Sequence, residues 1–319
     1  MAPKVYIDGH VGTTGLRIRD WLAGRDDLEL LTLPEADRRS PGARREMIRA
    51  SDLSVLCLPD DAAREAVGWA EGCDARILDA STAHRIADGW VYGLPELEPA
   101  QRDAIASARL VSNPGCWPSG VLLLLRPLID AGILAPTVPV TIHGLSGYTG
   151  GGRPLVERWE DPAAGLSALP FEAPYALDRT HKHIPEIVFY SGGIVREPQF
   201  VPSVGPFRCG MRVEIPLHAN VLERGVTGKR IWEALDERYR GEPFVRVLPV
   251  TDPLESNEHS FDPMACNDTN RMELRVLPHP SGHVLLMAVL DNLGKGAAGV
   301  AIQTLNLMLG RDETKGLPG

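Results

Sequence analysis

The sequence lacks the long apolar stretch that a membrane-spanning helix requires. Its apolar segments are short, and Val121–Leu125, for example, is followed at once by Arg126. A spanning helix needs about 20 largely apolar residues, so we expect no membrane span and no membrane partner. The chain also shows no targeting segment before the strand-like Val5–Ile7. We therefore expect the protein to work in the cytoplasm.

Cysteine is scarce, and basic charge is outweighed by acidic charge. The cysteines number five, an odd count, and they are too widely spaced for a disulfide framework or a CxxC metal site. We expect no bound metal. The formal net charge of -9 disfavours broad binding to nucleic acid. An anionic substrate would need a local basic pocket. The cysteines are Cys57, Cys73, Cys116, Cys209 and Cys266.

The length of 319 residues fits two domains, and the first half alternates strand and helix patterns. Such alternation indicates parallel βαβ units and an α/β, Rossmann-like dinucleotide-binding domain. The expected strands are Lys4–Asp8, Leu28–Leu33, Asp52–Leu58, Arg76–Ala80 and Arg109–Ser112, and the expected helices are Thr14–Ala23, Gly42–Ala50 and Asp60–Trp69.

After about residue 135 the strands follow one another, with one clear helix over Gly228–Arg240. This pattern predicts an α+β domain with a mostly antiparallel sheet. The apolar segment Ala297–Leu309 predicts a closing helix that returns to the first domain. We expect residues 1–115 and 295–319 to form the dinucleotide domain, and residues 116–294 to form the catalytic and oligomerisation domain. The expected strands are Val138–His143, Phe200–Val204, Met211–His218, Phe244–Val247, Met272–Leu277 and His283–Leu290.

A glycine-rich turn follows the first strand and opens the first helix. Its glycines are Gly9, Gly12 and Gly15, and Thr13 and Thr14 lie between the last two. Glycines let the backbone approach a pyrophosphate, and the helix start offers N–H groups to the anion. The spacing is GxxGxxG instead of the usual GxGxxG, and glycine turns without ligands are common. What favours a dinucleotide site here is the position of the turn between the first strand and the first helix.

The residues that follow the second strand determine whether the site prefers NAD or NADP. An acidic residue there suits the ribose of NAD, whereas arginine suits the 2′-phosphate of NADP. The segment contains both kinds, with Glu35 and Asp37 beside Arg38 and Arg39. We favour NADP bound through Arg38 and Arg39. The alternative is a solvated run of charges.

Cys116 has the sequence context of a nucleophile. It follows a predicted strand and a Pro-Gly turn, and precedes the apolar helix expected over Gly120–Ala131. A thiol near a helix N-terminus is stabilised as thiolate, and open α/β sheets bind ligands at the carboxyl ends of their strands. The alternative is a packed core thiol, the usual role of a lone cysteine.

Two histidines, His181 and His183, stand two residues apart. If this segment is extended, both rings face the same way and could line one pocket. No carboxylate or cysteine near them completes a set of metal ligands, which favours an acid/base role over a metal site.

The segment Asn113–Cys116 resembles the nucleophile motif of N-acetyl-gamma-glutamyl-phosphate reductases, relatives of aspartate-semialdehyde dehydrogenase. The resemblance extends along nearly the whole chain and is closest to the family's shorter-chain subgroup. One departure is Trp117-Pro118-Ser119, where the family more often has Tyr-Pro-Thr. The other segments that carry the resemblance are Gly9–Leu16, Asp79–Arg85, Tyr92–Leu97, Ser146–Arg153, His181–Glu186 and Asp291–Gly299.

The resemblance implies an NADPH-dependent reduction of N-acetyl-L-glutamyl 5-phosphate to the semialdehyde, through a thioester on Cys116, in arginine biosynthesis. It implies His181 as the acid/base, with His183 second, and a homodimer or homotetramer. Arg85 and Asn113 are the expected phosphate ligands, and Arg153 is a substrate ligand or a surface ion pair. The remaining residues implied at the cofactor are Ser81, Asn292, Lys295 and Gly296.

Two alternatives remain open at this point. An aspartate-semialdehyde dehydrogenase would use the same thioester chemistry on a free amino acid. A dinucleotide-binding regulator would bind NADPH without turnover and sense redox state at Cys116. The sequence also leaves open whether the substrate amine carries an acetyl or a carrier group.

Overall fold

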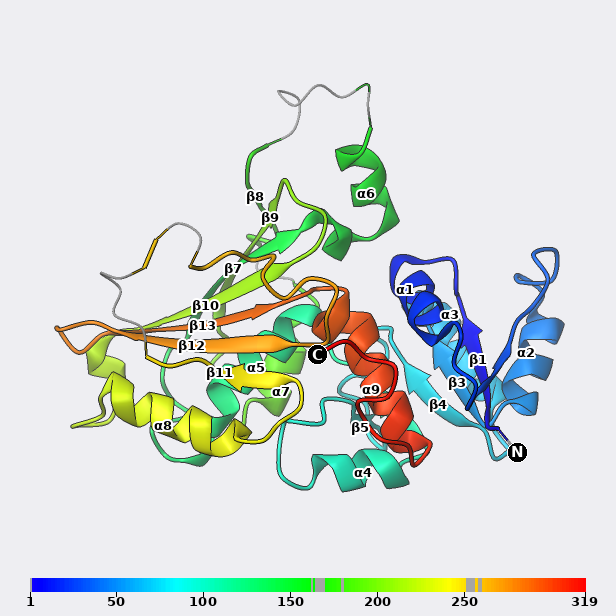
Figure 1. Ribbon diagram of the computed structural model, residues 1–319, viewed down its shortest axis with the longest axis horizontal. Helices are drawn as coiled ribbons and strands as arrows, with labels where there is room; N and C mark the ends of the chain where they lie inside the picture. The colour runs from blue at the N-terminus through cyan, green and yellow to red at the C-terminus, as the bar shows by residue number, and fades with distance from the viewer. Residues whose placement is uncertain (1, 162, 164–169, 179–180, 251–255, 258–259) are drawn as a thin grey trace. The chain divides into compact units, whose positions relative to one another are not determined.

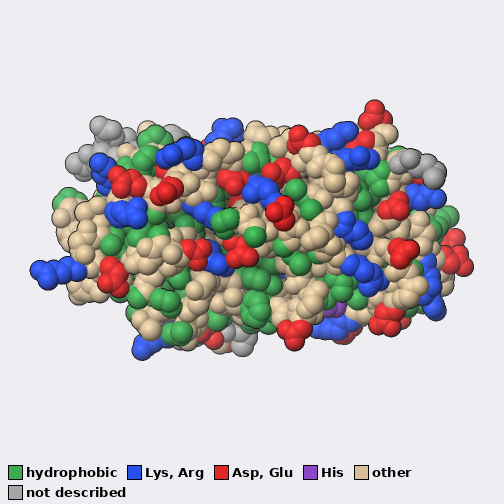
Figure 2. Space-filling view, turned by 90° about the horizontal axis from the view of Figure 1, so that it is seen from below, with side chains coloured by type: hydrophobic (Ala, Val, Ile, Leu, Met, Phe, Trp, Pro, Cys, Tyr) green, Lys and Arg blue, Asp and Glu red, His purple; other side chains and the backbone are tan. Residues whose placement is uncertain are grey.

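Figure 1 shows the computed structural model, which describes residues 2–161, 163, 170–178, 181–250, 256–257 and 260–319. The chain divides into two compact units. The first comprises Met1–Pro114 and Ala297–Pro318, and the second comprises Gly115–Gly296 with Gly319. Among the described residues, no helix combines the length and apolarity needed to cross a membrane. On the face shown in Figure 2, basic and acidic side chains are interspersed with apolar ones.

The first unit contains a six-stranded parallel sheet in the order β2-β1-β3-β4-β6-β5. The predicted Rossmann-like α/β class is confirmed. The strand order reverses between β1 and β3, which flank the point where such sheets bind ligands. The strands are β1 (Lys4–Asp8), β2 (Glu29–Leu31), β3 (Leu53–Leu56), β4 (Arg76–Asp79), β5 (Val91–Tyr92) and β6 (Leu110–Ser112).

Side-chain alternation along the strands builds a core on each face of this sheet. Val5 and Ile7 pack in one cluster with residues of α1 and α9, whereas Tyr6 packs on the opposite face with residues of α2 and α3. The closing apolar segment of the chain is therefore part of the first unit's core. The helices are α1 (Thr13–Leu22), α2 (Pro41–Ala50), α3 (Asp60–Trp69), α4 (Gln101–Ser107) and α9 (Gly299–Met308).

The second unit contains a seven-stranded mixed sheet in the order β11-β12-β13-β10-β7-β9-β8. Among the described residues, β7–β9 and β11–β12 pair parallel and the other neighbours pair antiparallel. The prediction of a mostly antiparallel sheet is confirmed. The strands are β7 (Thr141–Gly147), β8 (Ala173–Pro174), β9 (Gln199–Gly205), β10 (Met211–Leu217), β11 (Val245–Val247), β12 (Met272–Pro278) and β13 (Val284–Leu290).

Strand β7 starts three residues later, and ends four residues later, than the predicted strand Val138–His143. Its second half contains glycines that hide the strand pattern, yet it is held between β9 and β10. A Cβ on Gly144 would overlap the Trp117 ring, so the glycine is needed for the strand to lie against that ring. The other elements are α5 (Cys116–Asp130), α6 (Arg153–Trp159), α7 (Ile184–Tyr190), α8 (Gly228–Tyr239) and a π-helical turn η5 (Gly294–Ala298).

Helix α5 contains a proline in its interior, and a tyrosine of α8 compensates for it. Pro127 has no N–H, so the carbonyl of Leu123, one turn earlier, loses its helical partner. The hydroxyl of Tyr239 donates to that carbonyl at 2.8 Å. Because Tyr239 is only 3% exposed, water is poorly placed to replace it. This contact couples α8 to the helix that begins at Cys116.

Replacing Tyr239 by phenylalanine should lower the free energy of unfolding by about 1–3 kcal/mol, because the buried Leu123 carbonyl loses its donor. In a Pro127→Ala background the same change should cost much less, since alanine at position 127 supplies an N–H to Leu123. Denaturant unfolding of the four proteins in this double-mutant cycle measures the difference. Equal costs in both backgrounds would contradict the compensation.

Candidate active site

Cys116 is the first residue of α5, four residues earlier than the predicted helix start at Gly120. The N-cap is Gly115, which has no side chain to cap the helix. Instead its backbone N–H donates to Glu186 Oε1 at 2.7 Å, and its carbonyl accepts the Ser119 hydroxyl at 3.0 Å. The Cys116 side chain is half-buried at a helix N-terminus, where the partial positive charge favours thiolate.

The turn η5 packs directly against Cys116. A Cβ added to Gly296 would lie 2.8 Å from the Cys116 Cβ, closer than such atoms approach in proteins. Gly296, predicted at the cofactor, is thus required for the backbone to lie beside the candidate nucleophile.

Aromatic and imidazole rings form a chain beside Cys116. The Trp117 indole N–H donates to the Tyr175 hydroxyl at 3.0 Å. The Tyr175 ring lies 5.5 Å from that of His181, which lies 4.7 Å from that of His183. Burial, and then the nearby Cys116 charge, raise the pKa of Tyr175. Tyr175 therefore keeps its proton at neutral pH, and it contacts both the Trp117 indole and the His181 ring.

The histidine segment is a turn and does not meet the condition of an extended strand that we considered from the sequence. His183 has φ −87° and ψ −12° and is the N-cap of α7, and its N–H donates to His181 Nδ1 at 3.1 Å. Pro185 stands in the first turn of α7, where proline favours a helix start. That proline was the overlooked signal, and the same turn places Glu186, which sequence reasoning missed, beneath Gly115.

The glycine-rich turn fits a bound pyrophosphate. Gly9 has φ +83°, and a Cβ there would overlap the Cys57 carbonyl at the end of β3. A Cβ on Gly15 would lie 2.6 Å from the Gly9 oxygen. Helix α1 begins with no side-chain cap on Gly12, and Thr13 and Thr14 are half-buried in its first turn. The first N–H groups of α1 are thus the donors that a pyrophosphate requires.

An ion pair that the sequence did not reveal lies just before this turn. Asp8 is 2% exposed and accepts two contacts from Arg44 Nε and one, at 2.9 Å, from Arg44 Nη2. Arg44 also stacks over Trp69, 4.9 Å from the ring centroid. The pair neutralises a carboxylate at the end of β1, directly before the turn that we predicted to hold the pyrophosphate.

The two arginines predicted to read the 2′-phosphate follow β2. Arg38 pairs with Glu35 at 2.8 Å, and its side chain remains 28% exposed. Arg39 is exposed. Glu35 is thus paired with one of the two arginines, and its side chain remains 73% exposed.

The carboxyl end of β4 carries a compact polar cluster around the fully buried Asp79. The Ser81 hydroxyl donates to Asp79 Oδ2 at 2.7 Å, and His84 Nδ1 lies 2.6 Å from the same oxygen. The His84 ring stacks on Trp90 with centroids 4.2 Å apart. Ser81, predicted at the cofactor, thus uses its hydroxyl to fix this strand end.

Arg85 and Asn113, the two predicted phosphate ligands, lie together in the first unit. Arg85 is 8% exposed and donates from Nε to the Asn113 carbonyl at 3.1 Å. The Asn113 amide donates to the Ala297 carbonyl at 3.1 Å. Arg153 differs from both: it is 79% exposed and pairs with Glu157 on α6 at 2.7 Å, the surface ion pair that the sequence left open.

Two further residues predicted at the cofactor, Asn292 and Lys295, have side chains that contact other residues of the second unit. Asn292 Oδ1 accepts the Gly210 N–H at 2.8 Å, and its amide donates to the Thr149 hydroxyl at 2.9 Å. Lys295 is fully buried, with its ammonium 5.7 Å from the centroid of the Phe244 ring.

Two of the other cysteines have environments unsuited to a nucleophile. Burial, with Asp79 next, raises the pKa of Cys57 to about 12. Burial, with Glu273 next, raises the pKa of Cys266 to about 11. Both thiols therefore remain protonated at neutral pH, whereas the reactive form of cysteine is the thiolate.

Comparison with known proteins gives matches over both units. Family models describe residues 35–107 as a semialdehyde dehydrogenase NAD binding domain and residues 116–292 as a semialdehyde dehydrogenase dimerisation domain. N-acetyl-gamma-glutamyl-phosphate reductase 2 of Pseudomonas putida is 47% identical over 98% of this chain and 99% of its own. The N-acetyl-gamma-glutamyl-phosphate reductase of Burkholderia lata is 48% identical over 97% of this chain and 96% of its own.

Solved structures share the fold at much lower identity. Aspartate semialdehyde dehydrogenase II of Vibrio cholerae, complexed with ASA, gives a TM-score of 0.73 at 15% identity, covering 97% of this chain and 98% of that one. The aspartate semialdehyde dehydrogenase of Candida albicans, with NADP, gives 0.67 at 13% identity, covering 97% and 99%.

The packing of Gly296 on Cys116 generates a prediction for catalysis. Gly296→Ala should lower kcat on the order of 10–100-fold, because the added methyl displaces the thiol. Gly68→Ala is the matched control, since a Cβ there meets nothing within 4 Å. Steady-state kinetics with both variants tests this, and an unchanged kcat for Gly296→Ala would refute the contact's importance.

Proposed function

The chain belongs to the family of N-acetyl-gamma-glutamyl-phosphate reductases, and on this premise we propose that it reduces N-acetyl-L-glutamyl 5-phosphate to N-acetyl-L-glutamate 5-semialdehyde and phosphate, with NADPH, in arginine biosynthesis. The observation that carries the proposal is Cys116 on the first turn of α5, beside Tyr175 and the histidine pair. The proposal includes a homodimer or homotetramer. It also includes a cytoplasmic location, because five scattered cysteines suit a reducing compartment.

Cys116 carries out the first half of the reaction, the acylation of the enzyme. Its thiolate attacks the carbonyl carbon of the acyl phosphate, the bond from carbon to the phosphate oxygen breaks, and phosphate leaves. The acyl group then remains on Cys116 as a thioester, which divides one difficult step into two easier ones. We assign the phosphate group to Arg85 and Asn113, because a guanidinium and an amide are suited to its oxygens. Arg153 is the remaining candidate for a residue that binds the substrate.

The histidine turn supplies the acid. Because His181 Nδ1 accepts the His183 N–H, the proton of the neutral His181 ring resides on Nε2. His181 Nε2 can thus donate to the oxygen of the tetrahedral adduct on Cys116 and take the proton back when that adduct releases the aldehyde. His183, 5% exposed, orients His181 through this backbone contact and is the second candidate for the same role.

The residues of the glycine-rich turn fit NADPH, which when bound supplies the hydride. Gly9, Gly12 and Gly15 keep the turn close to the strand ends, and Thr13 and Thr14 begin the uncapped helix. Arg38 and Arg39 would read the 2′-phosphate. The side chains of Ser81, Asn292 and Lys295 are engaged inside the protein, so we assign them, with Gly296, to shaping the cofactor site.

One assay separates this proposal from its alternatives. The enzyme should reduce NADP with N-acetylglutamate semialdehyde plus phosphate, and should do so poorly with aspartate semialdehyde. A preference for aspartate semialdehyde would indicate the dehydrogenase. NADPH binding without any phosphate-dependent product would indicate a regulator. A semialdehyde linked to a carrier group, run in parallel, tests whether the amine must carry acetyl.

Cys116→Ser should keep the fold and lower turnover at least on the order of 10³-fold, because a hydroxyl is far less ionised than a thiol at neutral pH. The matched control is Cys73→Ser: the Cys73 thiol donates to the Ala70 carbonyl, and a hydroxyl can replace it there. Circular dichroism checks the fold. Substantial activity in Cys116→Ser would remove Cys116 from the mechanism.

Replacing Arg38 and Arg39 together by alanine should raise KM for NADPH at least roughly tenfold and leave KM for NADH nearly unchanged. Each charge-assisted contact to a phosphate contributes about 1.5–3 kcal/mol when well formed. Arg19→Ala, which removes an exposed cation that pairs with Asp20, controls for general charge loss. Equal effects on both cofactors would show that Arg38 and Arg39 do not read the 2′-phosphate.

A further inference from the structure

Four rings of the second unit form a closed cluster. The Trp117 ring lies 5.5 Å from that of Phe200, the Phe200 ring lies 5.0 Å from that of His181, and the His181 ring lies 5.5 Å from that of Tyr175. The Tyr175 hydroxyl closes the circle by accepting the Trp117 indole N–H at 3.0 Å. We call these four residues the ring cluster. Because each ring contacts two others, the cluster fixes Tyr175 and His181 relative to each other.

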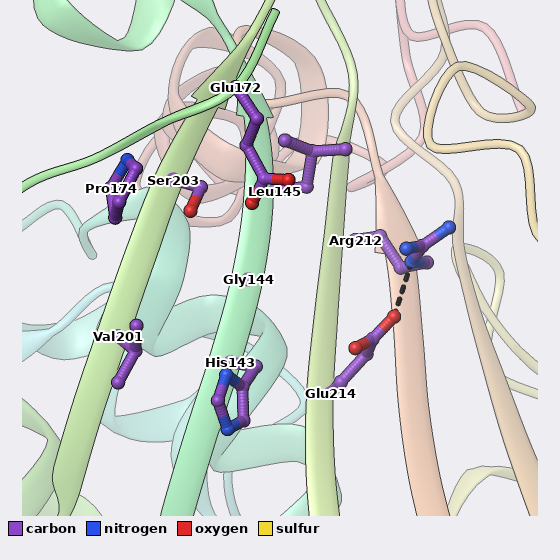
Figure 3. Close-up of a pocket in the computed structure, with 9 residues that line it drawn as sticks. All are labelled: His143, Gly144, Leu145, Glu172, Pro174, Val201, Ser203, Arg212 and Glu214. Carbon is purple, nitrogen blue, oxygen red and sulfur yellow. Dashed lines mark ion pairs between the residues drawn. The ribbon is translucent and has the colours of Figure 1, made fainter.

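The ring cluster lies on the face of the sheet that helix α5 covers. Side chains alternate along β9, and Val201 and Ser203 line the hollow that Figure 3 shows on one face of the sheet. Phe200 therefore lies on the opposite face, where it contacts Trp117 of α5. The ring cluster is thus separate from that hollow and lies on the same side of the sheet as the helix that begins with Cys116.

The backbone holds Tyr175 in place next to β9. Tyr175 directly follows β8, and its N–H donates to the Pro202 carbonyl at 3.0 Å, which extends the pairing of β8 with β9. The next residue, Ala176, has φ +50°, a left-handed conformation that alanine rarely adopts. Such strain persists only where the surrounding structure enforces it, and it is concentrated at functional sites. The fold therefore positions Tyr175 against the local preference of the chain.

The hydroxyl of Tyr175 has a proton that meets no acceptor among the described residues. A phenol hydroxyl can accept and donate hydrogen bonds, and here it accepts one, from Trp117, and donates none to the described part of the chain. Burial, and then the charge of Cys116, raise the pKa of Tyr175, so the proton is retained at neutral pH. The half-buried hydroxyl is thus a donor available to an acceptor that the substrate brings.

We propose that the Tyr175 O–H donates a hydrogen bond to the oxygen of the tetrahedral adduct on Cys116, beside His181 Nε2, and that Trp117 orients Tyr175 for this contact. The proposal rests on the proposed function. When the thiolate adds to the carbonyl carbon, the electron pair of the carbonyl π bond moves to that oxygen, and donors placed there stabilise the developing charge. Tyr175 keeps its proton throughout, and the proton that the adduct receives comes from His181.

The position of Trp117 favours the reacting carbonyl over the other acceptors of the substrate. Trp117 follows Cys116 directly in α5, so its indole brings Tyr175 close to the residue that binds the carbonyl carbon. The charge of Cys116 acts on Tyr175, which agrees with this proximity. A neutral phenol and a neutral imidazole suit an oxygen that becomes charged only during the reaction, whereas a permanent carboxylate is better matched by a cation.

Tyr175→Phe should lower kcat on the order of 10²–10³-fold and change KM by less than about twofold, because the hydrogen bond forms fully only in the adduct. Trp117→Phe keeps an aromatic ring but removes the N–H. It should lower kcat on the order of tenfold, because Tyr175 retains its hydroxyl but loses its orientation. In the Tyr175→Phe background, Trp117→Phe should alter kcat by less than about twofold. Steady-state kinetics of the four proteins measures this cycle.

Alkylation of Cys116 by iodoacetamide, followed by peptide mass spectrometry, is a readout that does not require turnover. Its rate in Tyr175→Phe should stay within about twofold of the wild-type rate, because Tyr175 acts on the adduct and not on the thiol. Tyr239→Phe is the matched control: it removes a buried phenol hydroxyl of the same unit outside the ring cluster. Its kcat should match that of the wild type at temperatures where circular dichroism shows it folded.

A wild-type kcat in Tyr175→Phe would overturn the proposal. A raised KM with unchanged kcat would do so too, since Tyr175 would then bind the substrate away from the reacting carbonyl. Much slower alkylation would trace the lost activity to a displaced thiol, which also contradicts the proposal. Independent losses in the two variants would remove the orienting role of Trp117. Should Trp117→Phe fail to fold, Tyr175→Phe alone decides the role of the hydroxyl.

Failure of this proposal is distinguishable from failure of the proposed function. An active wild type with an unaffected Tyr175→Phe removes only the role of Tyr175. A wild type that turns over neither semialdehyde removes both. If aspartate semialdehyde is the preferred substrate, the same variants are assayed with it, because the thioester chemistry is shared.

Discussion

The buried carboxylate of Glu186 accepts the Gly115 N–H at 2.7 Å, and this contact ties the start of helix α5 to helix α7. Because Gly115 has no side chain to cap α5, the helix start depends on Glu186 for one of its donors. The N-cap of the same α7 is His183, whose backbone N–H donates to His181 Nδ1 and so fixes the His181 ring. One hydrogen bond therefore connects the position of the proposed nucleophile with that of the proposed acid.

Close approach of backbone to backbone or ring is the second requirement. Gly296 lets η5 lie on Cys116, Gly144 admits the Trp117 ring, and Gly9 packs on the end of β3. At each position a methyl group would meet an atom that has little room to move. The absence of a Cβ at these glycines allows the close approach, and the strands and helices on either side hold the backbone at that distance.

Several buried polar groups in each unit are paired with specific partners. Asp79 holds Ser81 and His84, Asp8 holds Arg44, and Tyr239 completes the proline-interrupted helix. An unpaired buried group costs about 1–3 kcal/mol, so each pairing constrains the backbone around it. These buried pairings hold in place the strands and helices that carry the residues of the proposed chemistry.

The sequence determined the α/β class, the strand-turn-helix context of Gly9–Gly15 and the helix start near Cys116, because these depend on local periodicity and on glycine and proline. It did not reveal that Glu186 reaches Gly115 or that Asp8 pairs with Arg44. Those contacts join residues distant in the chain, and their partners are chosen by sheet order and packing. Tertiary structure alone decided them, because local preference carries no information about which distant side chain occupies the adjacent space.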